Sequence, residues 1–80
     1  MFVGIDCHKH RHAAALPNER GGLIDTLLFA NRPEGYRELI AWLVERDAAA
    51  ATVGIENPAR FGRPLATALA GAGFEVLGLV

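Results

Sequence analysis

Two acidic residues of the 80-residue chain stand in the same local pattern. Asp6 ends the tripeptide Gly4-Ile5-Asp6, and Glu56 ends Gly54-Ile55-Glu56. In an extended strand, side chains two residues apart share a face, so each carboxylate lies beside a glycine and leaves room for a metal ion or a phosphate. Neighbouring carboxylates repel unless a cation or a proton intervenes, and hard oxygen ligands of this kind suit Mg²⁺ or Mn²⁺. The pattern predicts metal-assisted phosphoryl chemistry, and the alternative is that both acids are solvated strand ends.

Four basic residues near these acids in the sequence are candidates for contact with a phosphate backbone: Lys9, Arg11, Arg60 and Arg63. Lys9 and Arg11 both lie in the predicted polar turn at residues 9–11. The other two flank the predicted start of a helix, where backbone N–H groups and the helix dipole favour an anion. Such contacts position a nucleic acid without reading its sequence. The alternative for all four is a solvating role on the surface.

Three histidines alternate in the run His8-Lys9-His10-Arg11-His12. On a strand they would face one way, as ligands of a transition metal do. A turn is predicted to interrupt them, and the chain has a single cysteine, so a closed zinc site has too few ligands. A solvated turn is the preferred interpretation.

Composition limits the classes of protein to which the chain can belong. Half of the residues are hydrophobic and are spread along the whole chain, which is typical of a globular domain. A formal net charge of −1 gives no global attraction to nucleic acid, so any such contact must come from a local basic patch. One cysteine excludes an internal disulfide. The sequence offers no candidate for a secretory signal or a membrane-length apolar run, so neither is expected. A soluble, cytoplasmic protein is expected.

The first part of the chain predicts three short strands, at residues 2–8, 12–16 and 23–29, joined by polar turns as an antiparallel meander. A helix should follow, with Asn31 as its cap, Pro33 in its first turn and Glu34 three residues after the cap. Its apolar stripe consists of Tyr36, Leu39, Ile40, Leu43 and Val44, and Asp47 and the following alanines end it.

The second part predicts a strand at residues 52–56, a helix at residues 63–72 and a last strand at residues 74–80. Leu65, Ala68, Leu69 and Ala72 share one face of that helix, and Gly71 or Gly73 stops it. Strand-helix-strand units imply parallel pairing with right-handed crossovers. The expected fold is therefore α/β, with a mixed sheet of order 3-2-1-4-5 in which the second strand is antiparallel and helices pack on the sheet. Because buried parallel strands need cover on both faces, we expect the chain to be truncated at Val80.

Several blocks of the sequence resemble the DEDD transposases of bacterial insertion sequences. These blocks are Gly4-Ile5-Asp6-Cys7-His8-Lys9, Asn31-Arg32-Pro33-Glu34-Gly35-Tyr36, Gly54-Ile55-Glu56 and Arg63-Pro64-Leu65. They occur in the family's order and span essentially the whole chain. The resemblance implies a ribonuclease H-like fold, similar to that of Holliday-junction resolvases, with residues 1–80 as the N-terminal part of the catalytic domain.

In that family, an Asp on the first strand and a Glu on the fourth are two of four acids that bind Mg²⁺, and Asp6 and Glu56 occupy those positions. The other two aspartates and a C-terminal domain with a nucleophilic serine have no counterpart in this chain. The resemblance implies DNA and a guide (bridge) RNA as partners of the full-length protein, which we expect to be a homo-oligomer. Cys7 replaces a more usual aliphatic residue and is expected to pack as a small apolar side chain.

Two other functions share some of these features. Actin-like and sugar-kinase-like phosphotransferases also end their first strand in an aspartate, but there a glycine-containing hairpin follows, whereas no glycine follows Asp6 until Gly21. A non-catalytic transposase remnant would share every motif. Because half of the acid set is missing, the 80 residues alone are expected to be inactive as a nuclease and to bind nucleic acid weakly.

Overall fold

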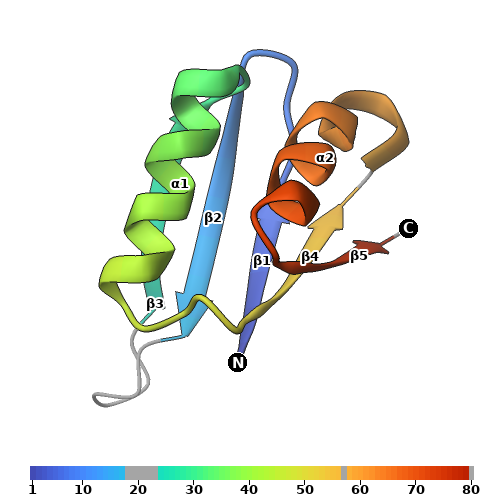
Figure 1. Cartoon of the computed structure of the whole chain (residues 1–80). Coiled ribbons are helices and arrows are strands. Elements are labelled where there is room, and N and C mark those ends of the chain that lie inside the picture. Colours follow the sequence, from blue (N-terminus) through green and yellow to red (C-terminus); the bar gives the residue numbers. More distant parts are fainter. Residues whose placement is uncertain (18–23, 57, 80) are drawn as a thin grey trace.

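The computed structural model describes residues 1–17, 24–56 and 58–79, which form a sheet and the helices that pack on it (Figure 1). The strands are β1 (Phe2–Asp6), β2 (Arg11–Pro17), β3 (Ile24–Ala30), β4 (Thr52–Glu56) and β5 (Glu75–Leu79). The helices are α1 (Pro33–Glu45) and α2 (Arg63–Gly71), and a short π-helical turn, η1 (Pro58–Gly62), precedes α2.

The strand order is β3-β2-β1-β4-β5, which confirms the predicted mixed α/β sheet. β2 pairs antiparallel with both β1 and β3, and β4 pairs parallel with both β1 and β5. This arrangement is consistent with a ribonuclease H-like fold. Because β1 and β4 are parallel neighbours, both end at the same edge of the sheet.

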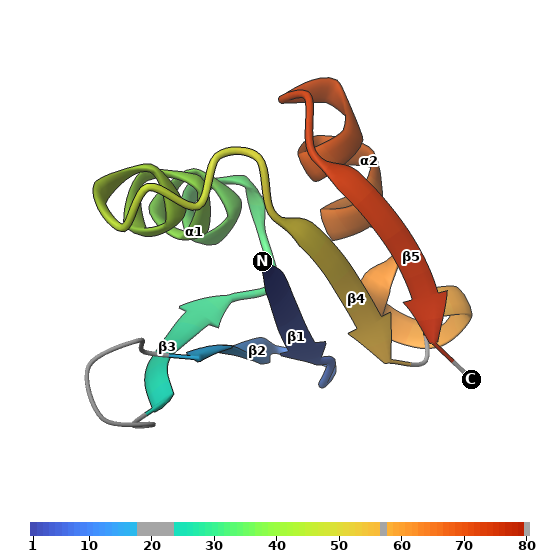
Figure 2. The ribbon, with the colours of Figure 1, turned by 90° about the horizontal axis from the view of Figure 1, so that it is seen from below.

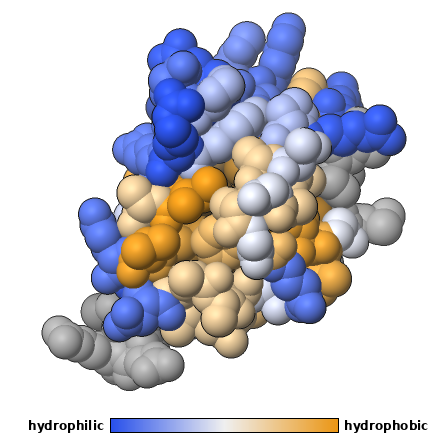
Figure 3. All heavy atoms as spheres, in the orientation of Figure 1, coloured by the Kyte–Doolittle hydropathy of each residue, from blue (hydrophilic) through white to orange (hydrophobic). Residues whose placement is uncertain are grey.

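Both helices cover the same face of the sheet, as Figure 2 shows. The strand residues beneath them are fully or almost fully buried: Val3, Ile5, Ala14, Leu16, Phe29, Val53 and Ile55. Residues between these positions along each strand point to the opposite face, because side chains alternate in a strand. On the side that carries the helices, hydrophobic side chains gather between α1 and α2, and hydrophilic ones gather at the end where α1 begins (Figure 3).

Helix α1 follows the predicted pattern with two corrections. Tyr36, Leu39 and Leu43 are buried as expected. Val44 is exposed, and Trp42 is buried on the packed face of the helix instead. The cap residue is Arg32, in an extended conformation and without a side-chain cap bond, and the predicted Asn31 cap is therefore wrong. The helix ends before Asp47, which takes a left-handed conformation (φ 55°) that terminates helical geometry.

Helix α2 begins at Arg63 as predicted and ends one residue early, at Gly71. Gly73 has a φ of 93°, which a glycine adopts readily, so it serves as the predicted stop. Leu65 and Leu69 are buried, whereas Ala72 is exposed and does not belong to the packed face. The η1 turn before this helix was not predicted.

The remaining strand boundaries differ slightly from those predicted. β1 ends at Asp6, so Cys7 and His8 belong to the following loop, while β2 extends the predicted strand by one residue at each end. β4 has the predicted bounds, and β5 begins one residue late, at Glu75. The predicted starting residue of the third strand, Leu23, and the final Val80 lie outside the described residues.

Candidate metal and nucleic-acid site

The two acids lie at the ends of adjacent parallel strands. In the β1–β4 register, Gly4 faces Gly54 and Ile5 faces Ile55, and the next residue of each strand is Asp6 or Glu56. Ile5 and Ile55 are buried under the helices, whereas both acids are exposed, since alternation directs them to the uncovered face. The structure therefore places both carboxylates at one edge of one face.

A shallow cavity of about 270 Å³ lies on this face of the sheet. Asp6, Glu56 and the two glycines that precede them by two residues all line it. At Gly4, an added Cβ atom would meet no other atom within 4 Å, so the space beside Asp6 is open. The expected room next to the carboxylates is present, and their joint use as metal ligands stays a prediction.

Both acids affect the pKa of the Cys7 thiol. Burial raises its pKa to about 11, and the negative charges of Asp6 and Glu56 act in the same direction. Both carboxylates are therefore close enough to the thiol to oppose its ionisation. A thiol with so high a pKa stays protonated at neutral pH and is a poor nucleophile or ligand, in agreement with its packing against the hydrophobic core.

His8 is a contact of Asp6 that the sequence analysis missed. The His8 Nε2 atom lies 3.0 Å from Oδ2 of Asp6, and both side chains are exposed. The interaction holds one carboxylate oxygen towards the loop and leaves the other without a contact to His8. The local signal was a histidine two residues after the acid, but only the turn of the chain after β1 brings the two side chains together.

His12 is buried, which corrects its assignment to a solvated turn. The side chain is fully buried, its Nδ1 atom accepts a hydrogen bond from the His8 backbone N–H at 3.2 Å, and its ring contacts Phe29 edge to face. Its Nε2 atom has no hydrogen-bond partner among the described residues. Burial lowers the pKa of His12, and the nearby Asn31 side chain acts in the opposite direction.

The loop between β1 and β2 interrupts the histidine run, as predicted, because β1 ends at Asp6 and β2 begins at Arg11. His8 and His10 are exposed, unlike His12. In the described part of the chain, no group of three or more His, Cys, Asp or Glu side chains is arranged to hold a metal ion.

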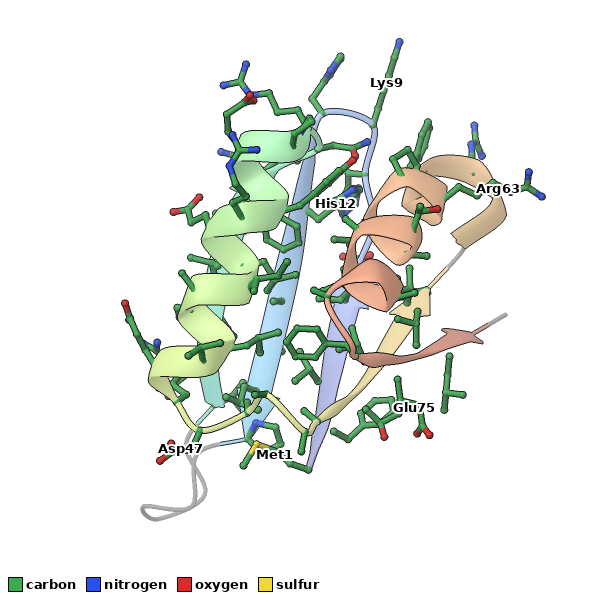
Figure 4. All side chains as sticks on the ribbon, in the orientation of Figure 1. Met1, Lys9, His12, Asp47, Arg63 and Glu75 are labelled. Atoms are coloured by element: carbon green, nitrogen blue, oxygen red, sulfur yellow. The ribbon has the colours of Figure 1, made fainter. Side chains whose placement is uncertain are left out.

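All four basic candidates are exposed. Arg11 is on the same face as Asp6, because Ala13, two residues along β2, pairs with Asp6. Lys9 and Arg63 lie at the same end of the molecule, where β1 and β4 end (Figure 4). Arg60 lies in η1, with its guanidinium 5.3 Å from the centre of the Phe61 ring, and Arg63 is the first residue of α2.

The model of the IS110-type DEDD transposases, described as a transposase, matches residues 3–80. The chain belongs to this family. No curated protein matches the chain.

Membership of a transposase family supports a role in the transposition of an insertion sequence, with DNA as the implied partner. The match covers both acids and the four basic candidates. It also covers all five strands except Phe2, the first residue of β1. No helix among the described residues is long and apolar enough to cross a membrane.

Proposed function

We propose that this transposase chain contributes Asp6 and Glu56 to a divalent-metal site for DNA strand cleavage and transfer in the full-length protein. The observation that supports the proposal most strongly is the β1–β4 register, which pairs Gly4 with Gly54 and Ile5 with Ile55 immediately before the two acids. Both acids are exposed at the ends of these strands. Adjacent strands lie about 4.8 Å apart, so acids at the ends of two neighbouring parallel strands can reach one cation. The match to DEDD transposases gives the acids a precedent.

The donor set fits Mg²⁺ or Mn²⁺. Both cations prefer oxygen ligands, and Mg²⁺ keeps several water molecules when one or two carboxylates bind it. The open space beside Gly4 provides room for such a hydrated ion. When bound, the ion would stabilise charge on the attacking and leaving oxygens of a phosphodiester. His8 would hold one oxygen of Asp6 and so fix the orientation of that carboxylate.

Lys9, Arg11, Arg60 and Arg63 are proposed to contact the phosphate backbone of DNA or of the bridge RNA of the full-length, homo-oligomeric protein. Arg11 shares the face of the acids, and the other three are exposed in segments that follow β1 and β4. Four basic residues can neutralise only a few phosphates, so the affinity for nucleic acid is limited. The contribution of each such contact decreases as the salt concentration rises. These contacts would position the backbone near the carboxylates in a cytoplasmic transposition complex.

Mn²⁺ binding to the purified chain, followed by electron paramagnetic resonance of the free ion, tests the metal site. Asp6→Asn and Glu56→Gln should each weaken binding by more than the roughly tenfold loss that follows removal of an outer-shell partner. Glu38→Gln is the matched control, because Glu38 is an exposed acid on α1, remote in the sequence from both strand ends. Equal affinity in the wild type and both strand-end variants would refute the site.

A cleavage assay with Mg²⁺ or Mn²⁺ tests whether these 80 residues can cleave DNA without the rest of the protein. The 80 residues alone should not cleave DNA, because two carboxylates form a poorer clamp than the four of the family pattern. Cleavage that depends on metal and disappears in Asp6→Ala would contradict this expectation and show that the chain is a complete nuclease.

A further inference from the structure

Asn31 makes more hydrogen bonds to distant segments than a residue in a simple helix-entry turn requires. Its backbone N–H donates to the carbonyl of His10 at 2.9 Å, and its side-chain Nδ2 donates to the carbonyl of Lys9 at 2.9 Å. Nδ2 also donates to the carbonyl of Phe61 over a longer distance of 3.4 Å. The Oδ1 atom accepts a bond from the Tyr36 hydroxyl at 2.5 Å.

These bonds join the two loops that leave the acid-bearing strands. Lys9 lies in the loop after β1, which carries Asp6, and Phe61 lies in the η1 turn after β4, which carries Glu56. Asn31 itself follows β3, so one amide connects segments 22 and 30 residues away along the chain. Apart from the sheet, it is a direct link between the loop after β1 and the turn after β4.

The contacts require an amide and not merely a polar residue. Both backbone carbonyls need a donor, and the Tyr36 hydroxyl needs an acceptor, so the side chain must offer both kinds of atom. Tyr36 is buried and fixes which end of the amide carries the oxygen. Capping of α1 does not explain the choice of residue, because Arg32 is the cap and the helix receives no side-chain cap bond.

We propose that Asn31 is a positioning residue for the metal site. By binding the loop after Asp6 and the turn after Glu56 at once, it keeps the two strand ends in one fixed arrangement. Lys9 and Arg60, for which phosphate contacts are proposed, lie beyond these ends and are held with them. This inference rests on the proposed function, because it assigns to Asn31 the geometry of that same site. It predicts that loss of the amide weakens metal binding without removing any ligand.

The test is a titration of the ¹⁵N-labelled chain with Mn²⁺, in which the bound ion broadens the amide signals of nearby residues. In the wild type, signals at the ends of β1 and β4 should broaden together. In Asn31→Ala, the affinity should fall by about tenfold, the loss typical of an outer-shell partner, and the two strand ends should no longer broaden in parallel. Thr67→Ala, an exposed position on α2, is the matched control and should behave as the wild type does.

The possible results separate this inference from the proposed function. If Asp6→Asn and Glu56→Gln both bind Mn²⁺ as tightly as the wild type, the metal site itself is refuted. If Asp6→Asn weakens binding but a folded Asn31→Ala does not, only the role of Asn31 is overturned. Should Asn31→Ala fail to fold, Tyr36→Phe decides, because it removes only the hydroxyl that orients the amide: a smaller loss of affinity in the same direction supports the proposal, and unchanged affinity overturns it.

Discussion

The two faces of this one sheet have opposite characters. On the covered face, Val3, Ile5 and Val53 pack beneath the helices and are almost completely buried. On the uncovered face, Phe2 and Leu77 remain exposed, and Leu28 is exposed across β2 from the position of Asp6. Strand alternation alone separates the two sets, since consecutive residues of a strand point in opposite directions.

The difference shows how the fold separates stability from chemistry. Burial of apolar side chains on the covered face provides the main stabilisation of the fold, whereas the uncovered face bears both acids and the glycines that leave space beside them. Exposed residues on the uncovered face can therefore be replaced at little cost in folding. The following predictions test how far this separation extends, beginning with the largest effect.

Truncation of a leucine should have very different consequences on the two faces. Leu39 on α1 is fully buried, so Leu39→Ala should lower the free energy of unfolding by about 2–5 kcal/mol through lost burial and a residual cavity. Leu28 on β3 is 58% exposed, so Leu28→Ala should change it by no more than about 0.5 kcal/mol. Urea unfolding followed by circular dichroism measures both values, and equal losses would show that the uncovered face is packed in solution.

The glycines provide a second matched pair. A Cβ atom on Gly35 would overlap the carbonyl oxygen of Ala30, a backbone atom that cannot move aside, because α1 approaches the end of β3 closely there. Gly35→Ala should cost about 1–3 kcal/mol despite the better helix propensity of alanine. Gly4→Ala meets open space and should leave the urea midpoint nearly unchanged. A stable Gly35→Ala protein would mean that α1 can shift away from the sheet.

His12, which is buried on the covered face of the sheet, should make the stability of the protein depend on pH. Burial lowers its pKa below the ordinary 6.5, so between that value and the folded pKa the unfolded chain binds a proton that the folded chain does not. Its contribution to stability is complete above pH 6.5 and is lost as the pH falls through this window. His12→Gln should flatten the profile of thermal midpoint against pH in that range, whereas His10→Gln, at an exposed position, should leave the slope in place.

Much of the fold could be predicted from the sequence because the deciding signals are local. The strand at residues 52–56 has the predicted bounds, and the sheet order follows from turn spacing and crossover handedness. The placement of Asp6 and Glu56 on one face also follows from local alternation, once β1 and β4 are neighbours.

The errors concern residues whose surroundings come from distant parts of the chain. Asn31 has the residue type of a helix cap, but the carbonyls of Lys9 and Phe61 compete for its amide. His12 stands in a polar run, yet as the second residue of β2 it points under the helices against Phe29. No local pattern contains these contacts, because each arises only when the strands assemble.

A small effect on stability should come from Asp6, the residue whose replacement is expected to affect function most. The Asp6 side chain is 58% exposed, and its contact with His8 is an exposed pair, which contributes little to folding. Asp6→Ala should therefore shift the free energy of unfolding by no more than about 0.5 kcal/mol while it removes one of the two proposed metal ligands. Urea unfolding and Mn²⁺ titration of the same preparation measure both quantities.

Val3→Ala, at a buried position on the same strand, is the natural comparison and should destabilise the protein while leaving the ligand set intact. Loss of folding in Asp6→Ala would show that the end of β1 is structural, and the separation between the two faces would then fail at the position where the proposed chemistry depends on it.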